Sequence, residues 1–401
     1  MEVQNVSQTM GLTDYKNERL KQISKQIYSK VDKLQNPPKN LCDSVSKLIC
    51  KLSVDAGFAS GIHEILWCLL SAYYNNQTVI LIPDWTKYFG RTPDVWERMF
   101  LSLFTTRSRE NWNDIFQPLS TSCDYKDLPK DQLNAPERPN TVIDRKLMNE
   151  LPKQFGSELM DILDGPNSWF HSQFVGYILR PQPRLEEFIK NFKKQINYRH
   201  PIVGIQVRRT DKISYGEALY YPISDYMVSV EDYFDKLELT QQVPQRLVYV
   251  ASDDPSVLPQ LIKQYPNYEF IGSTSNAKIA FSQTTRYSNE SLWGILADVF
   301  LLSESDYIVC TFSSAICRLS YQLMRYKQLD ASLQYRSLDV PFHYHHSLTP
   351  IRAVVYNHRP KSEEQWNLRI GDRLHERIRG RFTEWFDQSI NGRVYDDIEL
   401  V

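Results

Sequence analysis

The sequence lacks an apolar run long enough to cross a membrane. Its most apolar stretch, Ile65–Tyr74, is about half the ~20 residues that a spanning helix needs. Residues 1–40 are polar and contain no apolar segment typical of a secretory signal. A membrane anchor is therefore not expected within this sequence.

The sequence also lacks an excess of charge of either sign, since its formal net charge is -1 over 401 residues. No global field is available to attract nucleic acid or an acidic membrane, so no nucleic-acid partner is expected and an anion site requires a local cluster. Internal repeats and low-complexity tracts are absent as well. This length exceeds one hydrophobic core, and two or three domains are expected.

Cysteine is scarce but even in number, with six residues at positions 42, 50, 68, 123, 310 and 317. An even set is typical of disulfides in a secretory compartment, whereas free cysteines that pack as small hydrophobes are the alternative. The polar N-terminus disagrees with the secretory interpretation. Either an anchor lies outside this sequence or the compartment is a different one.

The first half of the chain mixes helical and strand-like patterns. Apolar residues at steps of three and four predict an amphipathic helix over 14–35. The apolar run Thr78–Ile82 predicts a short strand that ends before Pro83. Residues 42–197 are therefore interpreted as a first α/β domain.

From residue 201 onward, strands and helices alternate, which predicts a parallel sheet. Ligands of such open sheets bind beyond the carboxyl ends of the strands, where the strand order reverses. The expected strands are Ile202–Val207, Leu247–Ala251, Tyr268–Ile271 and Tyr307–Phe312, and the expected helices cover 223–237, 255–264, 291–303 and 314–326.

Beyond Pro350 the pattern changes to short alternating strands. We expect them at Arg352–Tyr356, Leu374–Ile378 and Ile398–Val401. They predict a small C-terminal β-barrel domain.

A basic cluster, Arg208, Arg209 and Lys212, follows directly on the strand Ile202–Val207. A guanidinium fork fits two phosphate oxygens at once, so one arginine here can neutralise a diphosphate leaving group without a metal. A solvated basic loop paired with Asp211 is the alternative. The position at a strand end favours the diphosphate interpretation.

Two adjacent carboxylates, Asp253 and Asp254, follow the next strand. Adjacent side chains cannot point the same way, so we expect one to face the cleft and the other to bind backbone or solvent. The sequence lacks an aspartate-x-aspartate motif after a strand. Leaving-group stabilisation by cations is therefore favoured, and no essential metal is expected.

Asp298 lies in a predicted helix that is apolar on nearly every side. A carboxylate there needs a partner, either a neighbouring loop or the N1–H and 2-amino groups of guanine. Ser313 and Ser314 follow a strand and begin a helix, so they are candidates to hold a phosphate or simply to cap the helix. Glu217 follows the basic cluster, and it is a candidate base for a sugar-acceptor hydroxyl.

Several long motifs resemble those of the eukaryotic core α1,6-fucosyltransferases and, more distantly, of bacterial nodulation fucosyltransferases. They are WFHSQFVGYILRPQPRLE, HPIVGIQVRRTDKI, YPNYEFI, RYSNESLWGILAD and DYIVCTFSSAICR. The resemblance runs from about Leu34 to the C-terminus. It implies inverting, metal-independent transfer of fucose from GDP-fucose to the innermost GlcNAc of N-glycans, in α1,6 linkage and without a cofactor.

The resemblance also implies an α/β fold with two lobes related to the GT-B transferases. The expected parts are an N-terminal helix or stem remnant (1–39), an open α/β domain (40–198), a Rossmann-type GDP-fucose domain (199–345) and an SH3-like β-barrel (349–401). The SH3-like part is expected beside the glycan site or in a structural role rather than on proline-rich peptides. A Golgi lumen location and a homodimer also follow from the resemblance, whereas the family's anchor and most of its stem are expected to be missing here.

The resemblance also implies roles for individual residues, assigned where the family motifs match this sequence. Glu217, Lys212 and Arg208 would be catalytic, with Glu217 as the base on the acceptor O6. Donor binding would fall to Arg208, Arg209, Asp211, Asp298, Ser314, Arg286 and Gln206, and acceptor binding to Asp253, Asp254 and Lys212. The implied disulfides are Cys42–Cys123, Cys50–Cys68 and Cys310–Cys317.

Some positions depart from the family pattern. Gln206 stands where the family has a histidine, and Ala315 stands in place of a glutamine. Gly216 lengthens the loop before Glu217, and Val54 occupies the place of a lysine that contacts the acceptor. They define the alternative hypothesis, a catalytically inactive relative that binds nucleotide or glycan, or an SH3-like adaptor.

Overall fold

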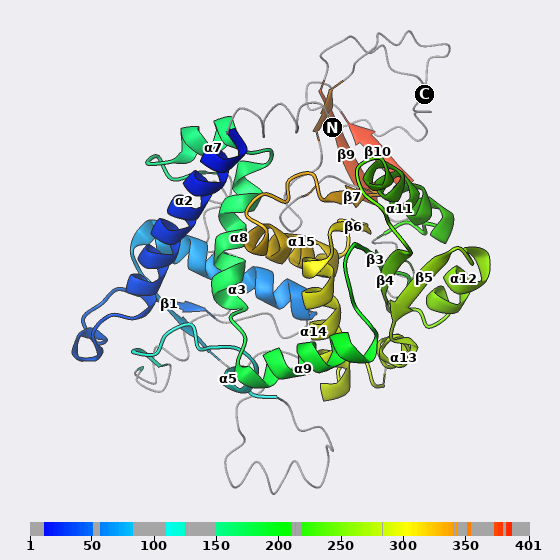
Figure 1. Ribbon diagram of the computed structural model, residues 1–401. Coiled ribbons are helices and arrows are strands. Elements are labelled where there is room, and N and C mark those ends of the chain that lie inside the picture. The colour runs from blue at the N-terminus through cyan, green and yellow to red at the C-terminus, as the bar shows by residue number, and fades with distance from the viewer. Residues whose placement is uncertain are drawn as a thin grey trace, which may run out of the picture.

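The computed structural model describes residues 12–50, 57–82, 110–124, 128, 150–210, 213, 218–282, 284–339 and 342, together with the backbone of three strands between 351 and 386. Figure 1 shows helices gathered around a parallel sheet.

The first described element is the long helix α2 (Leu12–Gln35), as the apolar spacing over 14–35 predicts. Its buried face consists of Leu20, Ile23, Ile27 and Val31. The opposite face is largely exposed, so packing against the α/β core holds the helix in place rather than intrinsic propensity.

A small parallel pair forms the first sheet. It joins β1 (Lys47–Cys50) to β2 (Thr78–Leu81), with the buried helix α3 (Phe58–Asn75) as the crossover. The predicted strand at 78–82 is confirmed, one residue shorter. Although α3 is strongly apolar, no helix in the described ranges is long and apolar enough to span a bilayer.

Further helices complete the first half of the chain. They are the one-turn 3-10 helix η1 (Lys39–Leu41), α5 (Trp112–Ile115), α7 (Gly156–Ile162), α8 (Pro166–Ile178) and α9 (Pro183–Gln195). Of these, α8 is buried along most of its length. It packs against both α3 and a helix of the second half, α15 (Ala315–Lys327).

A five-stranded parallel sheet dominates the second half, as predicted. Its order is β5-β4-β3-β6-β7, so strand order reverses between β3 and β6. Four strands match predicted ones, whereas β7 was not predicted and β6 ends at Cys310 rather than Phe312. The strands are β3 (Ile202–Val207), β4 (Arg246–Ser252), β5 (Tyr268–Gly272), β6 (Tyr307–Cys310) and β7 (Tyr335–Ser337).

Helices cover both faces of this sheet. On one face α11 (Ile223–Glu238) and α12 (Val257–Gln264) pack on side chains such as Val203 and Ile205. On the other face lie α14 (Asn289–Glu304) and α15, with α13 (Thr274–Phe281) against α14. In Figure 1, α14 and α15 lie between the sheet and the helices α3 and α8. One hydrophobic core runs through this layer and joins the two halves; the domain boundaries given above stay predictions.

Gly204 allows α14 to approach the sheet closely. A Cβ added there would lie 2.7 Å from Ser305 Oγ and 2.8 Å from Leu302 Cδ2. Contacts this short are repulsive, so a larger residue would push the end of α14 away from β3. The glycine thereby fixes the distance between the sheet and the helix that carries Asp298.

The C-terminal strands form a separate antiparallel sheet of order β10-β9-β8, made of β8 (Ile351–Ala353), β9 (Arg373–Arg379) and β10 (Phe382–Phe386). Two of the strands predicted here, at 352–356 and 374–378, overlap with β8 and β9. The third, at 398–401, lies outside the described residues, and so does most of 349–401. The SH3-like barrel therefore stays a prediction.

Candidate functional site

The basic cluster and the paired carboxylates meet at one edge of the sheet. Strand register places Val207, the last residue of β3, opposite Ser252, the last residue of β4. Arg208 and Asp253 each follow directly, so parallel strands carry them to the same carboxyl edge. The reversal of strand order beside β3 puts this edge where open α/β sheets bind ligands.

Asp253 holds the basic loop in shape. The residue is 5% exposed, and its carboxylate accepts hydrogen bonds from the Arg208 guanidinium and the Thr210 hydroxyl. It also accepts from the backbone N–H of Arg209 at 2.9 Å and of Thr210 at 3.3 Å. A buried carboxylate with this many donors is a rigid anchor for the loop. Its predicted acceptor role stays a prediction.

Asp254 points elsewhere, as expected for the second of two adjacent carboxylates. It accepts from the backbone N–H and hydroxyl of Ser256 at 2.8 and 2.7 Å, and from Arg209 at 3.3 Å. Burial raises the pKa of Asp254, but the Ser256 hydrogen bonds and Arg209 outweigh burial and hold the net pKa below its usual value. The carboxylate is therefore ionised at neutral pH.

A third guanidinium reaches the loop from another part of the chain. Arg286, which precedes α14, donates to the Thr210 hydroxyl at 3.3 Å. Arg209 lies over the ring of Tyr220, 4.9 Å from its centroid. The fold thus brings together three guanidinium groups, Arg208, Arg209 and Arg286, beside two carboxylates. An anion is the complementary ligand for such an excess of positive charge.

At the end of the neighbouring strand β6, a carboxylate that the sequence did not reveal binds the following loop. Asp339 accepts from the backbone N–H of Phe312 at 2.8 Å and of Ser313 at 3.2 Å. The Ser313 amide, which together with that of Ser314 is a predicted phosphate donor, is thus already hydrogen-bonded. Ser314 is the N-cap of α15 and makes no side-chain cap hydrogen bond. The hydroxyls and the first turn of α15 are therefore the groups left for a ligand.

Three buried polar atoms near this edge of the sheet have no hydrogen-bond partner in the described part of the chain. They are Oε1 of Gln206, Nε of Arg209 and Oγ of Ser313. A buried polar atom left unpaired costs about 1–3 kcal/mol. Gln206 belongs to β3 and Ser313 follows β6, so these atoms flank the reversal of strand order. They are available to a polar ligand.

Asp298 belongs to α14, which packs on the same sheet, and it contacts β4 at a point before the carboxyl edge. Its carboxylate accepts a hydrogen bond of 2.6 Å from the Tyr249 hydroxyl. Although the residue keeps some exposed surface, its carboxyl group is enclosed, and this burial raises its pKa to about 7 despite the opposing Tyr249 hydrogen bond. Tyr249 pairs with Gly204, which precedes Arg208 by about 13 Å of strand. The two predicted donor residues thus do not touch each other.

Gln206 lies between the position of Asp298 and that of Arg208 along the strand direction. It lies two residues beyond Gly204 on β3, and alternation along a strand turns it toward the α14 face, as it does Tyr249 on β4. Along β3, Gln206 therefore lies between the position opposite Tyr249 and the Arg208 loop, and its Oε1 has no hydrogen-bond partner among the described residues. A ligand that reached from Asp298 to Arg208 would contact Gln206.

Three predicted site residues, Asp211, Lys212 and Glu217, lie outside the described residues, as do Gly216 and Val54. Their roles stay predictions. Within the described ranges, no cluster of three or more histidine, cysteine or acidic side chains suits a metal ion. The expectation of metal-independent chemistry also stays a prediction.

The structure contains the three disulfides that the family resemblance implies. Cys42–Cys123 and Cys50–Cys68 lie in the first half of the chain. Cys310–Cys317 joins the end of β6 to the first turn of α15. The intervening loop contains Ser313 and Ser314, so this bridge restrains the phosphate-binding candidates.

Solved structures that this chain resembles include those of the fucosyltransferase NodZ and of POFUT1. The structure of NodZ from Bradyrhizobium is 12% identical, has a TM-score of 0.39, and the match covers 69% of this chain and 92% of that one. A structure of POFUT1 in complex with GDP-fucose is 10% identical with a TM-score of 0.42, and the match covers 73% of this chain and 97% of that one.

Sequence comparison gives the stronger result. The "Alpha-(1,6)-fucosyltransferase" of Drosophila melanogaster is 32% identical over 92% of this chain, which spans 58% of that relative's length. The protein of the same name from Caenorhabditis elegans is 28% identical over 98% of this chain, which spans 69% of its length. The model of the family "Alpha-(1,6)-fucosyltransferase N- and catalytic domains" matches residues 1–343. The chain therefore belongs to the alpha-(1,6)-fucosyltransferase family.

Proposed function

We propose that this chain transfers fucose from GDP-fucose, in α1,6 linkage, to the innermost GlcNAc of N-glycans. The observation that carries the proposal is the cluster of Arg208, Arg209 and Arg286 where strand order reverses, in a chain whose family model covers residues 1–343. Relatives bear the name of this activity, and the chain spans 58% of one and 69% of the other.

The diphosphate of the donor would lie between the basic loop and the first turn of α15. In the reaction, the bond between the fucose C1 and the β-phosphate oxygen breaks, and the departing GDP gains negative charge. Arg208 would hold the β-phosphate, with Arg286 beside it and Ser314 at the α15 N-terminus. Preorganised cations and helix amides stabilise such a charge without a metal. Asp253 keeps the Arg208 loop in place before the donor arrives.

Guanine would bind at the level of Asp298. The N1–H and 2-amino groups of guanine are donors, so Asp298 must be ionised to accept both. Its pKa of about 7 means that the carboxyl group is roughly half ionised near neutral pH before the donor binds. Gln206, with its free Oε1, would contact the nucleoside between guanine and the diphosphate.

The acceptor would approach from the side of the loop that contains Glu217. Glu217 would remove the proton from O6 of the GlcNAc as this oxygen attacks C1 from the face opposite the diphosphate, which inverts the anomeric configuration. Lys212 and Asp254 would contact the glycan, and Asp253 would serve acceptor binding through the loop that it anchors. A GT-B-like arrangement of two lobes, an SH3-like domain beside the glycan and a homodimer complete the proposal.

A luminal Golgi location accompanies the proposed activity. Three disulfides among the described residues support it, because such bonds persist in oxidising compartments and are rare in the cytosol.

A transfer assay with released N-glycans tests the proposal. The chain is incubated with GDP-fucose and a biantennary glycan that has an exposed GlcNAc arm, with and without EDTA, and products are read by mass spectrometry. We expect fucose on the innermost GlcNAc at the same rate in both reactions. Stabilisation by GDP without any transfer would instead support the inactive relative, and loss of transfer in EDTA would refute the metal-independent mechanism.

A further inference from the structure

A cavity of ≈ 680 Å³ lies far from the basic loop, between α8, α9, α14 and α15. Its residues on α14 and α15 are Phe300, Glu304, Leu323, Tyr326 and Lys327, near the C-terminal ends of both helices. Since these helices run antiparallel to the strands they adjoin, their C-terminal ends lie at the amino edge of the sheet. The candidate site lies at the carboxyl edge, so the two sites are distinct.

The floor of the cavity is apolar. Leu179, Ile189, Phe300 and Leu323 contribute to it and are each less than 10% exposed. The volume falls within the ~300–1,000 Å³ that is typical of small-molecule sites. An apolar body of an alkyl chain's size would therefore be desolvated there.

The rim is basic. Arg180, Lys190, Lys193, Lys194 and Lys327 line the cavity, and only two acidic side chains, those of Glu186 and Glu304, do so as well. The excess of positive charge is local, because the formal net charge of the chain is -1.

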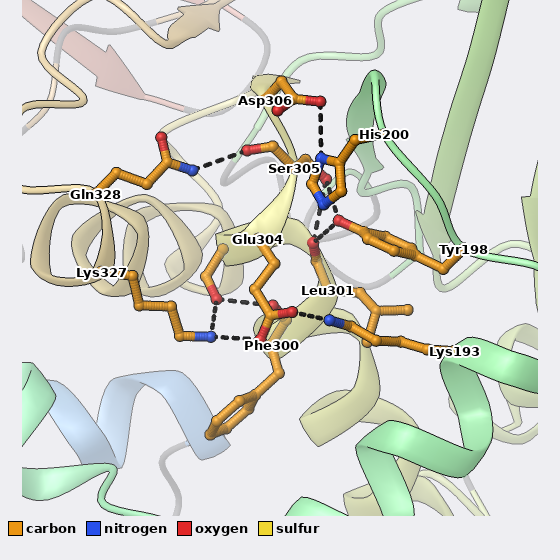
Figure 2. A network of polar contacts seen from close by, with 11 residues as sticks. Lys193, Tyr198, His200, Phe300, Leu301, Glu304, Ser305, Asp306, Lys327 and Gln328 are labelled. Atoms are coloured by element: carbon orange, nitrogen blue, oxygen red, sulfur yellow. Dashed lines mark hydrogen bonds and ion pairs between the residues drawn. The ribbon is translucent and has the colours of Figure 1, made fainter.

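Two of these lysines have their charge already balanced. Figure 2 shows Glu304 between Lys193 and Lys327, with which it forms ion pairs. Burial raises the pKa of Glu304, but the two lysines more than offset it, and the net pKa lies below its usual value. Glu304 is therefore fully committed to Lys193 and Lys327.

The other two lysines have no such partner. Lys190 and Lys194 are exposed on α9 and make no ion pair with any residue that the structure describes. They are four residues apart, on one helix face, where like charges repel, and Glu186, one turn before Lys190, forms no ion pair with either lysine in the described part of the chain. An anion bound at the rim would relieve this repulsion.

We propose that this cavity binds a single-chain anionic amphiphile, a phosphate monoester or carboxylate on an alkyl chain. The alkyl chain lies on the floor formed by Leu179, Ile189, Phe300 and Leu323, and the anionic group lies between Lys190 and Lys194. Neither an uncharged amphiphile nor a free phosphate satisfies both parts of the site. The site is independent of the proposed transferase activity.

Octyl phosphate, below its micelle concentration, is the probe, with octyl glucoside and inorganic phosphate as comparisons. We expect octyl phosphate to bind saturably by calorimetry and to raise the thermal unfolding midpoint, while the comparison ligands at the same concentration do neither. In the variant K190E/K194E, the affinity should fall about tenfold or more.

The matched control is K21E/K25E, which reverses two exposed lysines at the same spacing on α2. It should bind octyl phosphate like the unaltered chain. A second variant, Ile189→Trp, fills the cavity floor and should abolish binding while its far-ultraviolet circular dichroism spectrum stays unchanged. Equal affinity of the unaltered chain and K190E/K194E, equal binding of octyl glucoside or inorganic phosphate, or no saturable binding would overturn the proposal.

Discussion

Replacing Asp298 by asparagine should stabilise the protein, and more so at high pH. The carboxyl group of Asp298 has a pKa of about 7, against a usual value of 3.8, because it is buried. An acid whose pKa is raised by folding is destabilising when ionised. The free-energy cost therefore grows as the pH rises from the pKa of the unfolded state, near 4, to the pKa of the folded state, near 7. Below pH 4 the cost is absent. Asparagine keeps the size and can still accept the Tyr249 hydrogen bond.

The magnitude follows from the pKa difference. About three pKa units at 1.36 kcal/mol each give roughly 4 kcal/mol of cost at pH 8 and roughly 2 kcal/mol at pH 5. The residue retains some exposure, which weakens the effect, so the gain of Asp298→Asn should be about 1–2 kcal/mol larger at pH 8 than at pH 5.

Urea unfolding, followed by tryptophan fluorescence with the disulfides intact, measures the stability gain of Asp298→Asn at pH 5 and at pH 8. Asp161→Asn, at an exposed position of α7, is the matched control and should show no difference between the two pH values. If Asp298→Asn changes stability equally at both, the carboxyl group is not held protonated by burial and the reasoning is wrong. Stabilisation combined with loss of GDP binding is the pattern expected of a residue retained for function.

Other predictions concern the loop anchor and the helix contact. Asp253→Ala should remove the buried acceptor shared by Arg208, Thr210 and the Arg209 amide, lowering the unfolding free energy by about 2–4 kcal/mol. Urea titration measures this loss, and a change below about 0.5 kcal/mol would contradict the anchor role. Gly204→Ala should cost about 1–3 kcal/mol because the new methyl overlaps Leu302 and Ser305. A neutral result in thermal unfolding would show that α14 moves away freely.

Strand positions were predictable from the sequence because the central strands are apolar on both faces. The bounds of β3, Ile202–Val207, are the predicted ones, and each of its residues is buried. By contrast, β7 (Tyr335–Ser337) is three residues long and mixes aromatic, basic and hydroxyl side chains. Sequence periodicity has too few positions there to identify a strand. Tertiary pairing with β6 decides its conformation.

The candidate site was predictable in its location but not in its internal contacts. Strand-end position correctly places Arg208 and Asp253 at one edge, but it does not reveal that Asp253 turns back under the loop. Nor does it identify Asp339, which binds the amides of Phe312 and Ser313 from a segment beyond β7. These are tertiary contacts between segments that are distant in the sequence. Local sequence patterns do not predict them. Ser337 lies two residues before Asp339, and this spacing is a weak turn signal. It could have indicated Asp339 as a site residue.

The most direct test of the central claim compares transfer by the unaltered chain with that of Arg208→Ala. The readout is kcat for fucose transfer from GDP-fucose to a biantennary N-glycan with an exposed GlcNAc arm. Arg336→Ala, which alters an exposed arginine on β7, is the control and should transfer at the unaltered rate. If the Arg208 guanidinium stabilises the departing diphosphate, kcat should fall at least about a hundredfold. Transfer by Arg208→Ala within a few-fold of the unaltered chain would contradict the assignment.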